Sequence, residues 1–274
     1  MTKTEHQGHS RVRVLPVVAH LLALVVVLPM VWVVLSVLKP AGDLFDTGLP
    51  THWTLDNLRY VLTQIPLPRY LMNSALVAVA VTVAALFTHS MAAYALARLR
   101  FPGRGIAFSM IFSTLLVSLP VILVPLFLVV KQLGLLDSYA GLIIPAIFNA
   151  FGIFLLRQFY LTVPRELEEA AQIDGCGYWG RYWHVILPLS RPALSSLAVL
   201  FFLANWNAFL WPLTITTNPK LTMVQVGLAG LQGQYASAYN YILAAAVVAA
   251  IPTVLVFLAG QRRLVDAMKT TGLK

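Results

Sequence analysis

Apolar residues occur along this chain in long blocks that are separated by shorter polar stretches. Six blocks are predominantly apolar over about 20 residues, the length that a helix needs to cross the hydrocarbon core of a bilayer. They comprise residues 14–38, 74–96, 106–130, 139–156, 192–213 and 238–260. The pattern predicts an all-α integral membrane protein with six transmembrane helices in one domain, residues 14–260, and with both chain ends on the same side.

The distribution of basic residues predicts how these spans are oriented. The chain has 19 lysines and arginines, and all but five fall on the side that holds both termini. The five on the other side are Lys39, Arg59, Arg69, Lys131 and Lys220. Short loops rich in Lys and Arg remain in the cytoplasm. The tails, residues 1–13 and 261–274, and the long loop of about residues 158–190 are therefore predicted to be cytoplasmic, whereas residues 39–73 form an outer loop with short ordered pieces.

The composition indicates that lipid is the solvent for much of the chain. Of its 274 residues, 59% are hydrophobic and 11% charged, and the mean hydropathy is +0.80. Soluble domains carry about 25% charged residues, so too few polar side chains remain here to cover a soluble fold. The net charge of +9 does not indicate nucleic-acid binding, because the basic residues stand in small clusters between apolar blocks. The single cysteine, Cys176, can form neither an intrachain disulfide nor a metal cluster, and no metal site is expected.

The stretch "DGCGYWGR" at 174–181 has the G-x-G-x-x-G spacing of a dinucleotide-binding loop. That motif requires a preceding buried strand within a βαβ unit. The preceding "VPRELEEAAQI" is instead typical of a helix, with Glu166, Glu168 and Glu169 at its positive end. We therefore predict two short helices joined at Gly175, a residue that ends the first by adopting a positive φ.

Other residues of this loop predict the extent of the second short helix and the exposed face of the first. The spacing of Tyr178/Tyr182 and of Trp179/Trp183 predicts an aromatic stripe along one side of the second helix. Pro188 would end this helix, and Ser190 would cap the next span. Ala170 and Ala171 leave one side of the first helix bare, beside the charge of Glu169. From these residues alone, the first helix either packs under the membrane domain or docks onto a partner.

A more specific pattern covers the same loop. "EAAQIDGCGYWGRYWHVILP" resembles the EAA loop of the membrane subunits of binding-protein-dependent ABC importers: Glu-Ala-Ala, three residues, Gly, nine residues, Ile, one residue, Leu-Pro. The pattern falls on Glu169, Ala170, Ala171, Gly175, Val185, Leu187 and Pro188, with Val185 in place of Ile. "AAYALARLRFPGR" at 92–104 and "FFLANWNAFLWPLTI" at 201–215 resemble the smaller, six-helix permease of the carbohydrate-importer branch.

This resemblance implies a type I ABC importer permease fold in a bacterial cell membrane. It implies a non-catalytic subunit, which pairs with a second homologous permease and docks its EAA loop on one of two ATP-binding subunits. An extracytoplasmic solute-binding protein would deliver a sugar, an amino sugar or a glycerol-phosphate type of solute. The chain itself lacks the G-x-x-x-x-G-K-[ST] motif, so ATP and Mg²⁺ would be held by the ATPase partners and no cofactor by this chain.

Polar residues inside the spans suggest where a solute passes. Asn205, Trp206, Asn207 and Trp211 combine amide groups with aromatic faces, a chemistry suited to sugars, although interhelical hydrogen bonding is an alternative explanation. Pro120 and Pro125 interrupt the third span. His89, alone in the second span, is expected to bond to a backbone group or a neighbour.

Two other classes of protein remain as alternatives. A proton- or sodium-coupled secondary transporter relies on carboxylates inside the membrane, and the six predicted spans contain no Asp or Glu. A membrane-embedded enzyme would need a polar catalytic cluster at one interface, and no catalytic residues are predicted.

Overall fold

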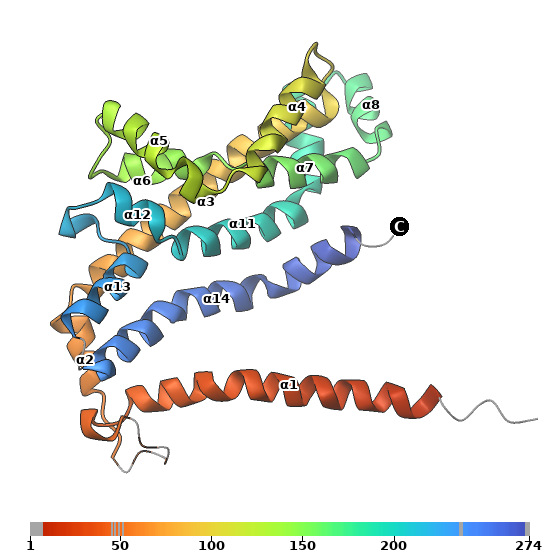
Figure 1. The fold of residues 1–274 in the computed structure, drawn as a ribbon. Coiled ribbons are helices and arrows are strands. Elements are labelled where there is room, and N and C mark those ends of the chain that lie inside the picture. Colours follow the sequence, from red (N-terminus) through yellow and green to blue (C-terminus); the bar gives the residue numbers. More distant parts are fainter. Residues whose placement is uncertain are drawn as a thin grey trace, which may run out of the picture. The chain divides into compact units, whose positions relative to one another are not determined.

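The structure is a computed structural model that describes residues 8–44, 46, 48, 50, 52–235 and 238–271 (Figure 1). The two tails predicted to be cytoplasmic, residues 1–13 and 261–274, lie partly outside this range. All regular elements of the described residues are helical. They are α1 (Gly8–Val37), η1 (Ala41–Asp43), α2 (Asp56–Thr63), α3 (Leu67–Arg98), α4 (Arg104–Ser113), η2 (Thr114–Leu116), α5 (Leu119–Gln132), α6 (Tyr139–Ile147), α7 (Ala150–Thr162), α8 (Glu166–Ile173), α9 (Tyr178–Arg181), the π-helix η3 (Tyr182–Ile186), α10 (Leu187–Leu189), α11 (Arg191–Trp206), α12 (Leu210–Ile215), η4 (Pro219–Leu221), α13 (Val224–Gln234) and α14 (Tyr239–Thr271).

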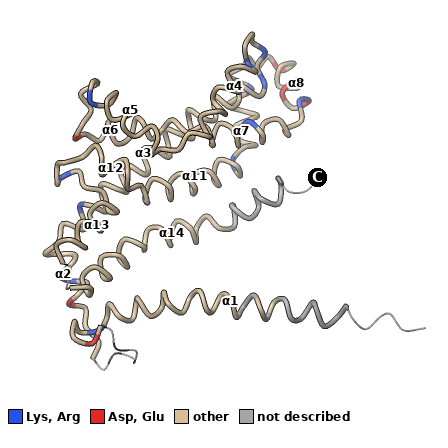
Figure 2. The backbone as a smooth tube through the Cα atoms, in the orientation of Figure 1, with Lys and Arg blue, Asp and Glu red and all other residues tan. Residues whose placement is uncertain are grey.

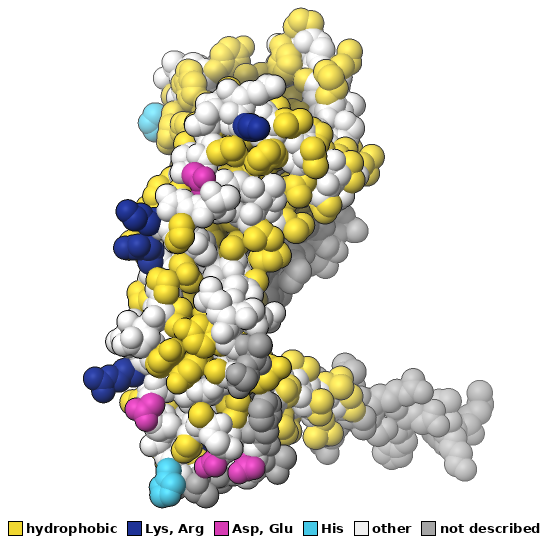
Figure 3. Space-filling model, turned by 60° about the vertical axis from the view of Figure 1, so that its left-hand side comes forward, with side chains coloured by type: hydrophobic (Ala, Val, Ile, Leu, Met, Phe, Trp, Pro, Cys, Tyr) yellow, Lys and Arg dark blue, Asp and Glu magenta, His cyan; other side chains and the backbone are white. Residues whose placement is uncertain are grey.

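The chain forms two compact units. The first comprises Met1–Pro66 with Gly230–Ala250, and the second comprises Leu67–Ala229 with Ile251–Lys274. Large apolar side chains are exposed throughout the described surface. On the face drawn in Figure 3, hydrophobic side chains predominate and charged ones are sparse. Such a surface suits lipid and not water.

Hydrogen bonds near the C-terminal end of α1 hold segments of the first unit together. Lys39 is 2% exposed, and its Nζ donates to the carbonyl oxygens of Asp46 (2.5 Å) and Gly48 (2.7 Å). Asn57 of α2 donates to the Lys39 carbonyl oxygen and accepts from Asn240 of α14, each at 2.8 Å. These bonds satisfy buried polar groups that would otherwise destabilise the fold. The segment 39–73 thus contains short ordered pieces, η1 and α2, as predicted.

Helix α3 is the centre of the second unit. It packs against α6, α7 and α11, and these helices run beside it in Figure 1. A Cβ atom on Gly152 of α7 would lie 2.5 Å from His89 Nδ1 and 2.6 Å from the Phe201 ring. Glycine at this position therefore allows α7 to approach α3 and α11 closely.

Two of the six predicted spans, 74–96 and 238–260, lie in single helices. Those at 106–130 and 139–156 are bent pairs of helices, and 192–213 is divided between α11 and α12. Leu67–Arg98 and Tyr239–Gln261 are long and apolar enough to cross a bilayer. Three pairs meet the same criterion only together: Arg104–Leu116 with Leu119–Gln132, bent by 109°; Tyr139–Ile147 with Ala150–Thr162, bent by 40°; and Tyr178–Leu189 with Arg191–Trp206, bent by 73°. Leu21–Val37 is a shorter apolar helix among the described residues. The described part of the chain therefore has between two and five candidate spans, and the count of six stays a prediction, as does the position of the termini.

Proline and polar residues account for the breaks within the spans. Pro120 lies in the first turn of α5, where a missing N–H is tolerated. Between α6 and α7, Phe148 and Asn149 are extended, and the Asn149 side chain caps α7 by accepting from Phe151 N at 2.8 Å. His89 Nε2 lies 2.8 Å from the Ile147 carbonyl oxygen freed by this break. The expectation that His89 bonds to a backbone group is confirmed.

Asp137 joins the segment between α5 and α6 to the segment between α12 and η4 in the second unit. Its carboxylate accepts from the backbone N–H groups of Asn218 (2.8 Å) and Thr217 (2.6 Å) and from the Thr217 hydroxyl (2.8 Å). The bond from Asn218, followed by those from Thr217, lowers the pKa of Asp137 below its ordinary value. The charged form of Asp137 therefore stabilises this joint.

Candidate functional site

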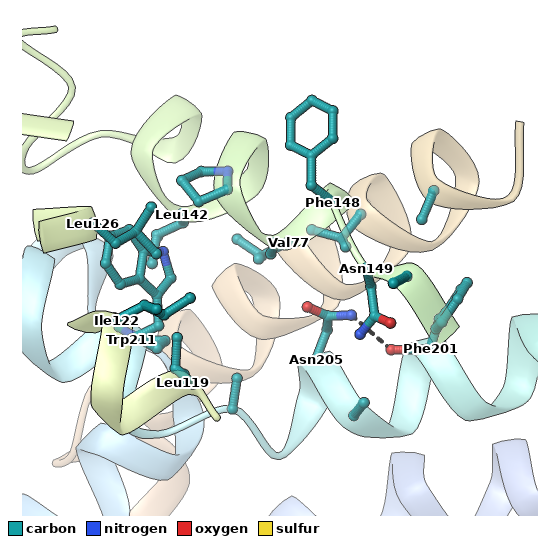
Figure 4. A pocket seen from close by; sticks show the side chains of 18 of the residues that line it. Val77, Leu119, Ile122, Leu126, Leu142, Phe148, Asn149, Phe201, Asn205 and Trp211 are labelled. Atoms are coloured by element: carbon teal, nitrogen blue, oxygen red, sulfur yellow. Dashed lines mark hydrogen bonds between the residues drawn. The ribbon is translucent and has the colours of Figure 1, made fainter. Parts of the chain in front are cut away.

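A cavity of about 440 Å³ lies in the second unit where the broken helices meet (Figure 4). Its walls come from α3, η2, α5, α6, α7, α11 and α12, and from the breaks between them. Apolar side chains such as Ile122 and Leu126 form most of the lining, and Asn149 and Asn205 add amide groups. An apolar pocket with a few convergent polar groups is the usual form of a small-molecule site.

The two asparagines lie next to each other in this cavity (Figure 4). Asn205 Nδ2 donates to the Phe201 carbonyl oxygen one turn earlier at 2.8 Å, which leaves its side-chain oxygen as an acceptor. Asn149 uses its side-chain oxygen to cap α7, which leaves its amide nitrogen as a donor. The pair can therefore offer a donor and an acceptor to a hydroxyl-bearing ligand.

The structure separates the four residues predicted to line the pathway. Asn205 and Trp211 line the cavity. Trp211 is 6% exposed and donates from Nε1 to the Gly141 carbonyl oxygen at 3.1 Å, which fixes α12 on α6. Trp206 is buried, with its ring stacked on Phe202. Asn207 is exposed, donates to the Leu203 carbonyl oxygen and accepts from Gln225. Trp206 and Asn207 are thus outside the cavity lining.

The sequence reasoning missed most of the lining residues, including three that carry polar or exposed aromatic groups. Thr114, Phe148 and Asn149 line the same cavity, and Phe148 is 78% exposed. The available signal was Pro145 followed by Asn149: a helix-breaking residue and then a residue that favours N-caps inside one apolar block.

The loop between α7 and α11 contains the two short helices that were predicted, joined at Gly175. This residue has φ 84. Gly175 N donates to the Gln172 carbonyl oxygen at 3.0 Å, and Cys176 N donates to that of Ala171 at 2.9 Å. This is the Schellman arrangement, which ends a helix with a left-handed glycine. The preceding element is α8, not a strand, so the glycine spacing does not form a dinucleotide loop.

The exposed and buried sides of α8 differ in chemistry. Glu169, Ala170 and Gly175 are exposed, Ala171 is half-buried, and Ile173 is 88% exposed. A small, uncrowded face on which Glu169 stands beside alanines and the exposed side chain of Ile173 is suited to a protein contact.

The buried side of α8 is anchored by Glu168, a role that the sequence reasoning did not assign. Glu168 Oε1 lies 3.1 Å from Arg98 Nε at the end of α3, with side-chain exposures of 9% and 6%. Tyr94 OH donates to Glu168 Oε2 at 3.3 Å. Arg98 Nη2 also donates to the carbonyl oxygens of Tyr160 and Val163 at the end of α7. A single guanidinium therefore holds α3, α7 and α8 together.

The remaining motif residues form the second short helix. It runs from α9 through a π-turn to α10, with Val185, Leu187 and Pro188 half-buried. Three details of the prediction are wrong. The helix continues one residue past Pro188, to Leu189.

The other two corrections concern side chains. The aromatic stripe is not realised: Tyr182 is 2% exposed, whereas Tyr178 and Trp179 exceed 60%, and the wide π-turn shifts the register of the residues after it. Ser190 does not cap α11 with its side chain, because its hydroxyl donates back to the Leu187 carbonyl oxygen at 2.9 Å. In the described part of the chain, no group of three or more His, Cys, Asp or Glu residues could hold a metal ion.

Known proteins resemble this chain over most of its length. Residues 89–270 match the family model of the binding-protein-dependent transport system inner membrane component. The arabinooligosaccharides transport system permease protein AraQ of Halalkalibacterium halodurans is 33% identical over 92% of this chain and 93% of its own. The diacetylchitobiose uptake system permease protein NgcG of Streptomyces coelicolor is 33% identical, over 90% and 83%. The sn-glycerol-3-phosphate transport system permease protein UgpE of Brucella abortus is 37% identical, over 76% and 74%.

A solved structure shares the fold. A chain of a bacterial ABC transporter involved in the import of the acidic polysaccharide alginate superposes with a TM-score of 0.83, at 24% identity, over 96% of this chain and 99% of that one. Together with the apolar helices, these similarities make the protein a non-catalytic subunit of the bacterial cell membrane with ATPase and solute-binding partners. The chain belongs to the family of binding-protein-dependent transport system inner membrane components, the permease subunits of ABC importers.

Proposed function

We propose that this subunit forms one half of the pathway of an ABC importer for a sugar or a sugar-like solute. The observation that carries the proposal is the cavity at the helix breaks, where the asparagine pair lies among apolar and aromatic walls. Hydroxyl groups need donors and acceptors, and sugar C–H faces pack against aromatic rings. The names of the relatives, which include transport systems for arabinooligosaccharides, diacetylchitobiose and sn-glycerol-3-phosphate, support the same class of solute.

Within this cavity, Asn205 is the proposed solute contact. Its side-chain oxygen is unused by its own backbone bond, and Asn149 stands beside it with an amide donor. Trp211 holds α12 in place in the cavity wall, because its indole N–H donates to the Gly141 carbonyl oxygen. Trp206 and Asn207, which were predicted for the pathway, support α11 from outside the cavity lining.

Coupling to ATP hydrolysis is proposed to run through the cytoplasmic loop. The docking surface is Glu169, Ala170 and Ala171, with Gly175 setting the bend and Val185, Leu187 and Pro188 seating the second short helix. Its partner is one of two ATP-binding subunits, which hold ATP and Mg²⁺. A second homologous permease supplies the other half of the pathway, and an extracytoplasmic solute-binding protein delivers the solute. Exposure of α8 on the side opposite the Arg98–Glu168 pair supports this assignment.

The proposed orientation places this loop inside the cell, with six spans and both termini cytoplasmic. A single cysteine in place of Gly103 should be labelled only from the cytoplasmic side, and one in place of Asp56 only from outside, in a background where Cys176 is Ser. Labelling in the reverse sense would place the docking loop outside and refute the coupling proposal.

One experiment tests the function as a whole. The chain should be purified with its companion subunits under mild detergent, reconstituted into liposomes, and assayed for ATP hydrolysis stimulated by the binding protein with arabinooligosaccharides, diacetylchitobiose or glycerol 3-phosphate. We expect an ATPase to copurify and at least one solute of this class to enter only with ATP. Uptake driven by a proton gradient without an ATPase would contradict the proposal.

A further inference from the structure

A cationic cleft lies in the second unit beside the turn that joins α3 to α4. Its volume is about 520 Å³. In Figure 2, basic residues gather where α3 leads into α4, close to α8. The residues that line the cleft are Arg98, Arg100, Phe101, Pro102, Arg104 and Arg165. Arginines from the end of α3, the start of α4 and the turn before α8 therefore converge on one hollow.

Three of these four positive charges have no counter-charge. The charge of Arg98 is balanced by Glu168, and this is the one ion pair within 4.0 Å in the part of the chain that the structure describes. Arg104 is held in place by donating from Nη1 to the Leu99 carbonyl oxygen at 3.0 Å, but this neutral acceptor does not balance the positive charge of the guanidinium group. Arg100 and Arg165 are exposed. Like charges gathered in one cleft favour an anion between them.

The start of α4 adds to this field. Its N-cap is Gly103, with φ 78 and no side-chain capping bond. The first N–H groups of a helix lack partners within the helix, and they favour negative charge. Planar guanidinium groups bind phosphate oxygens in pairs and with defined geometry. The chemistry of the cleft is therefore that of a phosphate site.

Exposed apolar side chains line the cleft or follow it along α4. Phe101, which lines it, is 41% exposed, and Ile106 and Met110 of α4 are 67% and 61% exposed. Ile106 and Met110 are four residues apart and share one face of α4. A soluble phosphate compound would gain nothing from this surface, whereas acyl chains can lie along it. The cleft also stands on the arginine-rich side, where the cytoplasmic leaflet presents anionic lipids.

We propose that this cleft binds the phosphate headgroup of an anionic phospholipid. Arg100, Arg104 and Arg165 contact the phosphate, and the acyl chains lie against Phe101, Ile106 and Met110. Because the cleft shares Arg98 with the joint that holds α8, an occupied cleft stabilises the attachment of the docking loop. The site is independent of the solute pathway, and its failure would leave the transport proposal intact.

The test uses the full chain in nanodiscs that contain phosphatidylglycerol and phosphatidylcholine in equal amounts, with the retained lipids measured by native mass spectrometry. The cleft variant is Arg100→Gln/Arg165→Gln. The matched control is Lys131→Gln/Arg191→Gln, which removes the same charge outside the cleft. A charge-keeping variant, Arg100→Lys/Arg165→Lys, shows whether loss of lipid follows charge or damage to the fold.

The wild-type chain and the control should retain phosphatidylglycerol in preference to phosphatidylcholine. The preference should fall roughly fivefold for each arginine lost from the cleft, and the lysine variant should keep most of it. If the double variant does not fold, Arg100→Gln alone gives the same comparison, because that side chain is exposed.

Four results would overturn the proposal. The wild-type chain could hold both lipids equally, or the control could lose as much preference as the cleft variant. Inorganic phosphate in excess could displace phosphatidylglycerol completely, which would identify a soluble phosphate compound as the ligand. Finally, the cleft variant could keep its lipid while losing the copurifying ATPase, which would make these arginines a protein contact.

Discussion

Replacing Glu168 with glutamine should release α8 from the end of α3 while leaving the exposed face of α8 chemically unchanged. The side chains of the Arg98–Glu168 pair are 6% and 9% exposed, at 3.1 Å. Removing one charge from a buried pair strands the other, at a cost of about 3–5 kcal/mol. Glutamine keeps the shape of Glu168 and can still accept from Tyr94, so the lower end, about 3 kcal/mol, applies. The equilibrium for local opening of α8 should then shift by about a hundredfold.

Hydrogen–deuterium exchange of the full chain in detergent, without the ATP-binding subunits that Glu169 is proposed to contact, measures this opening at Glu166–Ile173. The matched control is Glu169→Gln, which removes an exposed charge from the neighbouring position and should leave the exchange unchanged. In a double-mutant cycle, Glu168→Gln should cost little once Arg98 is methionine, because no buried charge remains to be stranded. Equal and small effects at 168 and 169, or additive effects in the cycle, would show that the pair does not hold α8.

Three further predictions concern Asn205 in the cavity, the bend at Gly175 and the joint formed by Asp137. Asn205→Leu should reduce transport by about three- to tenfold through the loss of one hydrogen bond to the solute, whereas Asn207→Leu should change transport little. Equal transport defects, or loss of assembly in both variants, would refute the assignment of Asn205, and not Asn207, to the solute. Gly175→Val should weaken copurification of the ATPase, because φ 84 costs a β-branched residue about 1–2 kcal/mol or more, although a Cβ atom there meets open space. Gly177→Ala, at a negative φ, is the control. A larger loss of ATPase with Gly177→Ala than with Gly175→Val would refute the role of Gly175 in the bend. Asp137→Asn should speed amide exchange at residues 217–218. Because the folded pKa is lowered, wild-type protection should be complete above the ordinary value of 3.8 and be lost as the pH falls below it; protection unchanged in acid would contradict this role.

The sequence was sufficient for properties that depend on local or averaged chemistry. The helical membrane architecture follows from long apolar blocks, and the positive φ of Gly175 follows from a glycine placed just after an acidic, alanine-containing helix. The family follows from the spacing of the loop motif, which matches known permeases. The G-x-G-x-x-G spacing does not mislead, because the residues before it favour a helix.

What sequence could not provide depends on three-dimensional packing. Glu168 and Glu169 are adjacent and chemically identical, and only the position of Arg98 decides which is buried. Asn205, Trp206 and Asn207 are consecutive, and since each helical residue turns by about 100°, they cannot all face one cavity. Pro120 indicates an interruption of the third span, but hydropathy does not reveal that the chain bends by 109° just before it.

The attachment of α3 at both ends has a mechanical consequence. At one end Arg98 holds α7 and α8. Near the other, Asn73 donates to the carbonyl oxygens of Lys220 and Thr222, each at 2.9 Å. The 32 residues between its limits span about 48 Å, without a glycine and with a proline only in the first turn. After its first turn, helix α3 therefore has neither the proline nor the glycine at which helices usually bend. We expect it to move as one piece if α8 is displaced, with bending confined to the broken helices around it.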